Sequence, residues 1–154
     1  MTVEMRVDFP GGKKVNAQYK DFVIQTDQPS YAGGDGSAPA PFDLFLASIA
    51  TCSGLYVLAF CERRGISLDS NYLVMKPRWN PDKKMIEKID IEIHLPSEFP
   101  DRYKNAVIKA VDSCSVKNHI INPPSFEIRV LKAAPANAGL EEAKDSRSRF
   151  SERE

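Results

Sequence analysis

The sequence predicts a single-domain α+β protein, and three observations support this fold class. Short segments of alternating apolar and polar residues, typical of strands with one buried face, occur near the N-terminus and again between residues 68 and 95. A long apolar segment opened by Pro41 lies between them and predicts a helix. A length of 154 residues with 42% apolar content suits one domain with its own core. We place this domain at residues 1–132 and a charged tail at residues 133–154.

The N-terminal part predicts three antiparallel strands followed by a loop. Val3, Met5, Val7 and Phe9 alternate with polar residues, and the glycines at 11 and 12 favour a turn, so residues 15–19 are expected to return as the second strand of a hairpin. Residues 22–25 predict a third short strand. Residues 27–40 are rich in Gly, Pro, Asp and Ser, which favour turns. This loop is long enough to carry a functional site.

The central helix is expected from Pro41 to Arg64. Asp43 complements the positive N-terminal dipole, and Gly65 suits the C-cap. Apolar residues surround this helix on all sides, which is typical of a helix that is buried all round. Because one 154-residue domain has little chain left to surround it, we expect a homodimer that encloses two such helices.

The second half predicts a further hairpin, a helix and a last strand. Residues 68–78 and 88–95 form the hairpin, with a turn at residues 80–82. Pro100 opens a helix whose apolar residues recur at spacings of three and four as far as Cys114, which places Cys114 on the buried face at the C-terminal end. Phe126, Ile128 and Val130 predict the final strand.

The charge and cysteine content narrow the class of function. Lys and Arg together number 21, as do Asp and Glu, so nothing favours nucleic acid or a membrane surface as partner, and a small neutral substrate fits better. Three cysteines without the dense spacing of a secreted scaffold indicate a reducing compartment. The N-terminus lacks the apolar core of a signal peptide. We therefore expect a cytoplasmic protein without a membrane span.

Two of the cysteines are candidate site residues. Cys52 lies in the central helix among small residues, and Cys114 lies on the inner face of the next helix, so one could attack a peroxide and the other resolve the sulfenic acid as a disulfide. Inert core packing is the competing interpretation, because free cysteine is often a small buried hydrophobe. Cys61 falls on the side of the helix opposite Cys52. His119 could tune Cys114, but no metal or cofactor site is predicted, and the GGDG loop lacks the features of a dinucleotide or phosphate motif.

Two longer motifs resemble those of the OsmC/Ohr family. The run FVIQTDQPSYAGGDGSAPAPFDLFLASIATCSG is similar to the stretch in which an Asp-x-Pro and a Gly-Gly loop precede the helix with the first cysteine. The run SCSVKN is similar to the second cysteine motif. The resemblance extends from the first strand to about Leu131 and leaves the tail unmatched. Asp43 matches the acidic residue of the YhfA-like branch.

The resemblance implies both a fold and an activity. The implied fold is a swapped homodimer with antiparallel sheets wrapped around two long central helices. The implied activity is thiol-dependent reduction of organic or hydrogen peroxides in oxidative-stress defence, with Cys52 as peroxidatic thiol, Cys114 as resolving thiol and a dithiol as reductant. A stress-associated small-molecule binding protein with little peroxidase activity is the alternative, and a purely structural role for the cysteines is a third interpretation.

The sequence also departs from the pattern of the peroxidases. In the Ohr branch a glutamate about ten residues before the first cysteine holds an arginine, and here Phe42 occupies that place. No Arg or Lys occurs between Phe22 and Asp43. Arg63 or Arg64 could supply the activating cation from a partner subunit, although the helix dipole also accounts for them. The cation that activates Cys52 therefore stays unidentified at the level of sequence.

Overall fold

The structure is a computed structural model that describes residues 4–69 and 71–132. The chain divides into two units, residues 1–123 and residues 124–154, and each is described by itself. All helices and strands of the described residues belong to the first unit. The predicted tail at 133–154 lies outside the described residues.

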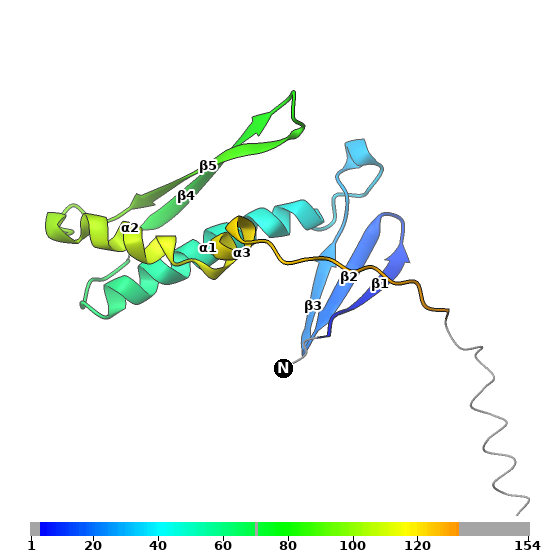
Figure 1. Ribbon diagram of the computed structural model, residues 1–154, viewed down its shortest axis with the longest axis horizontal. Coiled ribbons are helices and arrows are strands. Elements are labelled where there is room, and N and C mark those ends of the chain that lie inside the picture. Colours follow the sequence, from blue (N-terminus) through cyan, green and yellow to red (C-terminus); the bar gives the residue numbers. More distant parts are fainter. Residues whose placement is uncertain (1–3, 70, 133–154) are drawn as a thin grey trace, which may run out of the picture. The chain divides into compact units, whose positions relative to one another are not determined.

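The N-terminal sheet has three antiparallel strands in the order β1-β2-β3 (Figure 1). They are β1 (Arg6–Gly11), β2 (Lys14–Tyr19) and β3 (Phe22–Thr26), in which Ala17 of β2 pairs with Val7 on one side and Ile24 on the other. Gly11 and Gly12 connect β1 to β2 at φ angles of 123° and 61°, which favour glycine. The three predicted strands are thus confirmed, although residues 1–3 lie outside the described residues.

The loop after β3 is organised around a buried carboxylate. Asp27 is 1% exposed, and its Oδ1 accepts a hydrogen bond from the Gln28 N–H at 2.7 Å. Its Oδ2 accepts from the Ser37 N–H at 3.0 Å, the Ser37 hydroxyl at 2.7 Å and the Asp35 N–H at 3.2 Å. The two Ser37 donors contribute most, and together with the Gln28 and Asp35 N–H groups they outweigh burial and lower the pKa of Asp27 to about 2. The segment includes a short 3₁₀ turn, η1 (Ser30–Ala32).

Helix α1 (Pro41–Glu62) follows the predicted bounds within two residues. Asp43 accepts a hydrogen bond from the Ala40 N–H at 2.9 Å and so caps the N-terminus. One face is buried, with Ile49, Ser53, Val57, Phe60 and Cys61. Leu55 and Leu58 lie on the opposite side and are 59% and 41% exposed in the single chain, and Phe42 and Phe45 near the N-terminal end of the helix are 51% and 40% exposed. The expectation of burial on every side is therefore not met within one chain.

Among the described residues, one helix, α1, has the length and the apolar composition needed to cross a membrane. Its most apolar window has a mean hydropathy of 2.0. The core helix of a soluble protein satisfies the same criterion, so this finding is weak evidence for a membrane span.

Strands β4 (Tyr72–Asn80) and β5 (Met85–His94) form a long antiparallel hairpin. The ion pairs Lys76–Glu92 at 2.6 Å and Arg78–Asp90 at 3.2 Å link the strands across one face. The other face is apolar and includes the pair Met75 and Ile91. The predicted hairpin is confirmed with other bounds: β4 begins at Tyr72 and not at residue 68, and it continues two residues beyond the expected end. Strand β5 begins at Met85 and not at residue 88, and a register shift between Arg78 and Trp79 lies near the turn.

The predicted helix from Pro100 to Cys114 is confirmed, and a short helix that was not predicted follows it. A 3₁₀ turn, η2 (Asp101–Tyr103), leads into α2 (Lys104–Asp112), and α3 (Ser115–Ile121) follows after a break. Cys114 lies two residues after the end of α2, at this break, and is the N-cap of α3. The core lies between α1, α2 and the hairpin, with Val57, Phe60, Cys61, Phe99, Val107 and Val111 as its buried residues.

Residues 124–132 of the second unit form neither helix nor strand. The prediction of a strand there was therefore wrong for the single chain. A strand needs a neighbour to pair its N–H and C=O groups, and no described residue pairs with this segment. Its alternating apolar side chains are fully open to solvent: Phe126 is 86% exposed, Ile128 is 92% and Val130 is 93%.

Candidate thiol site

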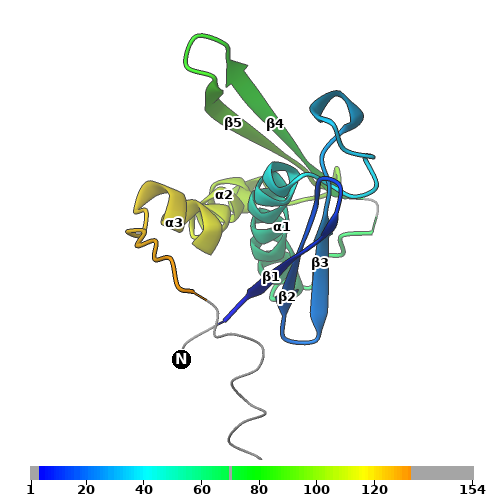
Figure 2. The same cartoon turned by 90° about the vertical axis from the view of Figure 1, so that its right-hand side faces the viewer.

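Helix α1 and the N-terminus of α3 bring Cys52 and Cys114 together. The two helices pack against each other, with α2 also along α1 (Figure 2). The Cys52 side chain lies near enough to Cys114 to lower its pKa, and both cysteines are free thiols. Cys114 is 0% exposed, whereas Cys52 is half-buried. The structure thus places the two candidate thiols near each other, with Cys52 as the more accessible residue.

Polar groups of α1 and α3 surround Cys114 and favour its charged form. Burial is the largest influence and raises the pKa of Cys114. The Cys52 side chain, the backbone N–H groups of Lys117 and Val116, and the Ser53 side chain act against burial, and together they lower the pKa below that of an ordinary thiol. Cys114 is therefore a stronger acid than an ordinary thiol.

Two more side chains of α1 border the thiol pair. Ser53 is 1% exposed, and its hydroxyl donates to the Ile49 carbonyl at 2.8 Å. Tyr56 lies one turn after Cys52, and its hydroxyl is 3.4 Å from the Ser115 hydroxyl, next to Cys114. Sequence reasoning missed both residues as site components. The spacing of four between Cys52 and Tyr56, which places residues on one helix face, was the available signal.

No cation is among the groups that set the pKa of Cys114 in the described part of the chain. Arg64, a candidate from the sequence, donates to the Phe60 carbonyl at 3.1 Å, and its guanidinium lies 3.7 Å from the centre of the Phe60 ring. Phe42 stacks on Phe45 with ring centres 5.4 Å apart. Arg64 therefore serves the C-terminal end of α1 within its own chain.

Cys61 is separate from the thiol pair. It is 0% exposed within the core cluster, and burial raises its pKa, with a smaller opposing effect of Arg64. The expectation that it lies away from Cys52 is met. A buried thiol with a raised pKa is a poor nucleophile.

His119 contacts its own helix. Its Nδ1 is 2.7 Å from the Ser115 carbonyl oxygen, and the side chain is exposed. It is not among the groups that set the pKa of Cys114. Its hydrogen bond is consistent with the structural role weighed from the sequence.

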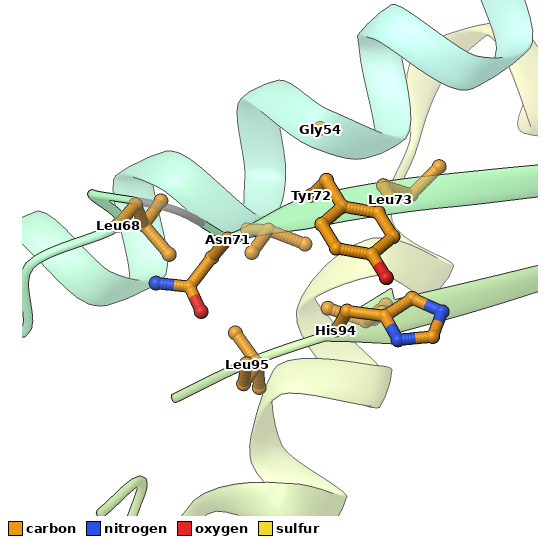
Figure 3. A pocket seen from close by; sticks show the side chains of 9 residues that line it. Gly54, Leu68, Asn71, Tyr72, Leu73, His94 and Leu95 are labelled. Carbon is orange, nitrogen blue, oxygen red and sulfur yellow. The ribbon is translucent and has the colours of Figure 1, made fainter. Parts of the chain in front are cut away.

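A half-open cavity of about 220 Å³ lies on another side of α1 (Figure 3). Gly54 and Val57 of α1 line it, with residues of β4, β5 and the segment before β4. The Tyr72 and His94 rings stack with centres 4.4 Å apart at its edge. Because Gly54 is two residues from Cys52, about 200 degrees around the helix, this cavity is distinct from the thiol pair.

A family model described as OsmC-like protein matches residues 34–129, which is more than half of the chain. The chain belongs to the OsmC-like protein family. The match includes both thiols of this OsmC-like chain, and the resemblance read from the cysteine motifs is confirmed at the level of the family. No curated protein matches the chain.

Solved structures of OsmC-like proteins share the fold. An OsmC-like protein from Mycoplasma pneumoniae is 16% identical with a TM-score of 0.61, covering 85% of this chain and 95% of its own. An organic hydroperoxide resistance protein OsmC from Legionella pneumophila is 21% identical with a TM-score of 0.55, covering 78% and 89%. A candidate osmotic stress induced and detoxification response protein from Psychrobacter arcticus 273-4 is 22% identical with a TM-score of 0.64, covering 77% and 87%. At these identities the likeness shows the fold, and the predicted α+β class is confirmed.

Proposed function

We propose that this OsmC-like chain is a cytoplasmic thiol-dependent peroxidase that reduces organic or hydrogen peroxides through Cys52 and Cys114 in oxidative-stress defence. The observation that supports this most is that the Cys52 side chain lies near enough to the buried Cys114 thiol to lower its pKa. A hydroperoxide is small and uncharged, which suits a site without a cation among its described groups. The name of the Legionella protein, organic hydroperoxide resistance protein, also favours this substrate class.

In the first step, Cys52 attacks the hydroperoxide while Cys114 accepts its proton. The charged Cys114 sulfur is the base that a nucleophile without a neighbouring cation needs. The Cys52 sulfur attacks the terminal peroxide oxygen, and the O–O bond breaks. Cys52 becomes a sulfenic acid, and the leaving alkoxide takes a proton from water to become the alcohol. Cys52 is the attacking thiol because it is the more exposed of the two.

In the second step, Cys114 resolves the sulfenic acid. Its sulfur attacks the Cys52 sulfur, the disulfide forms, and the sulfenic oxygen leaves as water with the proton of the Cys114 thiol. An external dithiol then reduces the disulfide by two successive exchanges and becomes a disulfide itself, which restores both thiols. Two electrons pass from the dithiol to the peroxide in each cycle.

The active form in this proposal is a homodimer. Leu55 and Leu58, on the side of α1 away from its buried face, are 59% and 41% exposed, and a second copy of the chain would cover them. The alternating side chains at 126, 128 and 130 also suit a strand that pairs with a second copy. Both features support the swapped arrangement that the family resemblance implies.

The test is a titration of the reduced protein with cumene hydroperoxide, followed by mapping of cysteine oxidation by mass spectrometry. Wild type is expected to form the Cys52–Cys114 disulfide at near-stoichiometric peroxide. Cys114→Ser is expected to stop at the sulfenic acid of Cys52, and Cys52→Ser is expected to lose peroxide consumption. Cys61→Ala is the matched control and should form the same disulfide as wild type. If Cys52 and Cys114 stay reduced in excess peroxide, the proposal is wrong.

The alternative function is small-molecule binding with little peroxidase activity. The cavity beside Gly54 favours it, because apolar walls from Leu73, Ile93 and Leu95 meet the polar groups of Asn71 and His94 (Figure 3). A binding protein of this kind would keep its ligand when both thiols are replaced. Thermal shifts of the Cys52→Ser, Cys114→Ser double variant against a fragment set separate the two functions.

A further inference from the structure

Helix α3, which directly follows Cys114, buries little of its own surface. All seven of its residues are partly or fully exposed, and Ile120 and Ile121 are 45% and 64% exposed. A segment with so few buried apolar contacts has low local stability and opens before the core does. The position of Cys114 relative to α1 therefore depends on a few contacts at the start of α3.

One of these contacts is a hydrogen bond between Tyr56 and Ser115. The Tyr56 hydroxyl of α1 is 3.4 Å from the hydroxyl of Ser115, the first residue of α3. Among the described residues, it is the one hydrogen bond that joins a side chain of α1 to a side chain of α3. Each hydroxyl can donate or accept, so the bond does not depend on the charge of the nearby thiols. It links the helix that carries Cys52 to the residue after Cys114.

Tyr56 is suited to be the fixed end of this link. Its side chain is half-buried and packs against the core cluster of α1, α2 and the β4–β5 hairpin. Side chains on a helix point back toward its N-terminus, so the Tyr56 ring extends toward the turn of α1 that contains Cys52, four residues earlier. The ring therefore carries a hydroxyl from the core to the start of α3, on the face of α1 where the thiol pair lies.

We propose that Tyr56 is a positioning residue whose hydrogen bond to Ser115 holds the start of α3 against α1. It thereby keeps Cys114 within reach of Cys52 for disulfide formation. This inference rests on the proposed thiol chemistry of the same site. A disulfide closes only when the two Cα atoms are within about 7 Å, so an outward shift of α3 opposes it. Because the hydrogen bond and the disulfide join the same two segments, each favours the other by the same factor.

The experiment measures the equilibrium between the reduced thiol pair and its disulfide in the full chain. The protein is equilibrated with mixtures of reduced and oxidised dithiothreitol, and mass spectrometry quantifies the Cys52–Cys114 disulfide. Two electrons and two protons pass from the protein thiols to oxidised dithiothreitol, so no peroxide is needed. Tyr56→Phe keeps the ring and loses the hydroxyl. It should lower the equilibrium constant by about threefold, a modest factor because the bond is long for two hydroxyls.

Three further variants show whether the hydrogen bond is the cause. Ser115→Ala should lower the equilibrium constant by the same factor, and the double variant with Tyr56→Phe should lower it no further. Ser115→Thr keeps the hydroxyl and should stay at the wild-type value. The matched control is Tyr103→Phe, which loses a similar contact, between the Tyr103 hydroxyl and Arg102 at 3.3 Å, and should leave the equilibrium unchanged.

Two results would overturn the proposal. One is a Tyr56→Phe protein that equilibrates like wild type and Tyr103→Phe, and the other is a double variant in which the two single effects multiply. Urea unfolding of the same variants separates a change at the thiol pair from a general loss of stability, which would affect Tyr103→Phe as well. The proposed peroxidase is judged separately by the consumption of cumene hydroperoxide, so either conclusion can fail while the other stands.

Discussion

Replacement of Gly34 by alanine tests the organisation of the loop before α1. A Cβ at this position would lie 1.9 Å from the Gln28 carbonyl oxygen, 2.5 Å from the Gln28 carbonyl carbon and 2.8 Å from Asp27 Oδ1. Normal contacts are above 3.4 Å, so the backbone around Gln28 has to move. Gly34 does not need a left-handed conformation, and the cost therefore comes from the contact alone. Overpacking of this kind costs about 3 kcal/mol, because the movement also strains the hydrogen bonds of the buried Asp27 carboxylate.

The assay is urea unfolding followed by circular dichroism, at one protein concentration because a dimer makes stability depend on concentration. For a chain of this length, a loss of about 3 kcal/mol in the free energy of unfolding would also lower the melting temperature, by about 6–12 °C. Gly54→Ala is the matched control: a Cβ there meets nothing within 4 Å, and alanine suits a helix interior better by about 1 kcal/mol. We expect opposite signs for the two variants. A Gly34→Ala protein within about 0.5 kcal/mol of wild type would refute the reasoning.

Two further predictions concern the loop carboxylate and the dimer. The pKa of Asp27 is lowered from 3.8 to about 2, so the carboxylate stabilises the fold above about pH 4 and loses this contribution as the pH falls toward 2. Asp27→Asn should therefore be less stable than wild type at neutral pH and should lose less further stability between about pH 4 and pH 2. If the free energy of unfolding of the variant depends on pH as that of wild type does, the prediction is wrong. In analytical ultracentrifugation, the wild-type protein should sediment with about twice the 17.2 kDa mass of one chain. Leu58→Lys places a charge on the exposed face of α1 and should shift the protein toward the monomer. A wild-type protein that sediments as a monomer would exclude the dimer.

The sequence predicted the elements whose pattern is local. Strands β1, β2 and β5 alternate with period two, and α1 begins at Pro41 with Asp43 as its cap. The pattern failed where the structure depends on distant partners. Residues 126–130 have the alternation of a strand, yet no described strand pairs with them. The apolar outer face of α1 likewise has no cover within the described part of one chain.

The candidate site was predictable in its cysteines and not in its electrostatics. The motifs around Cys52 and Cys114 indicated the pair, and the structure places Cys52 near enough to Cys114 to lower its pKa. The search for a cation among Arg63, Arg64 and the early lysines could not find the groups that lower the Cys114 pKa, because those groups are uncharged. Backbone N–H groups have no signature in the sequence, and the effect of Ser53 on the pKa of Cys114 depends on how α3 packs on α1.

The break between α2 and α3 explains how a buried cysteine can hold a charge here. In one continuous helix through Cys114, the N–H groups of Val116 and Lys117 would bond to carbonyls four residues earlier and would be unavailable to a side chain. Because α3 begins anew at Ser115, its first N–H groups have no partner within the helix, and those of Val116 and Lys117 lower the pKa of Cys114 although its side chain makes no cap hydrogen bond. The Asn118 N–H bonds the Cys114 carbonyl at 2.9 Å, which fixes Cys114 in the N-cap position. The break after α2 therefore leaves two N–H groups beside the thiol on which the proposed chemistry depends.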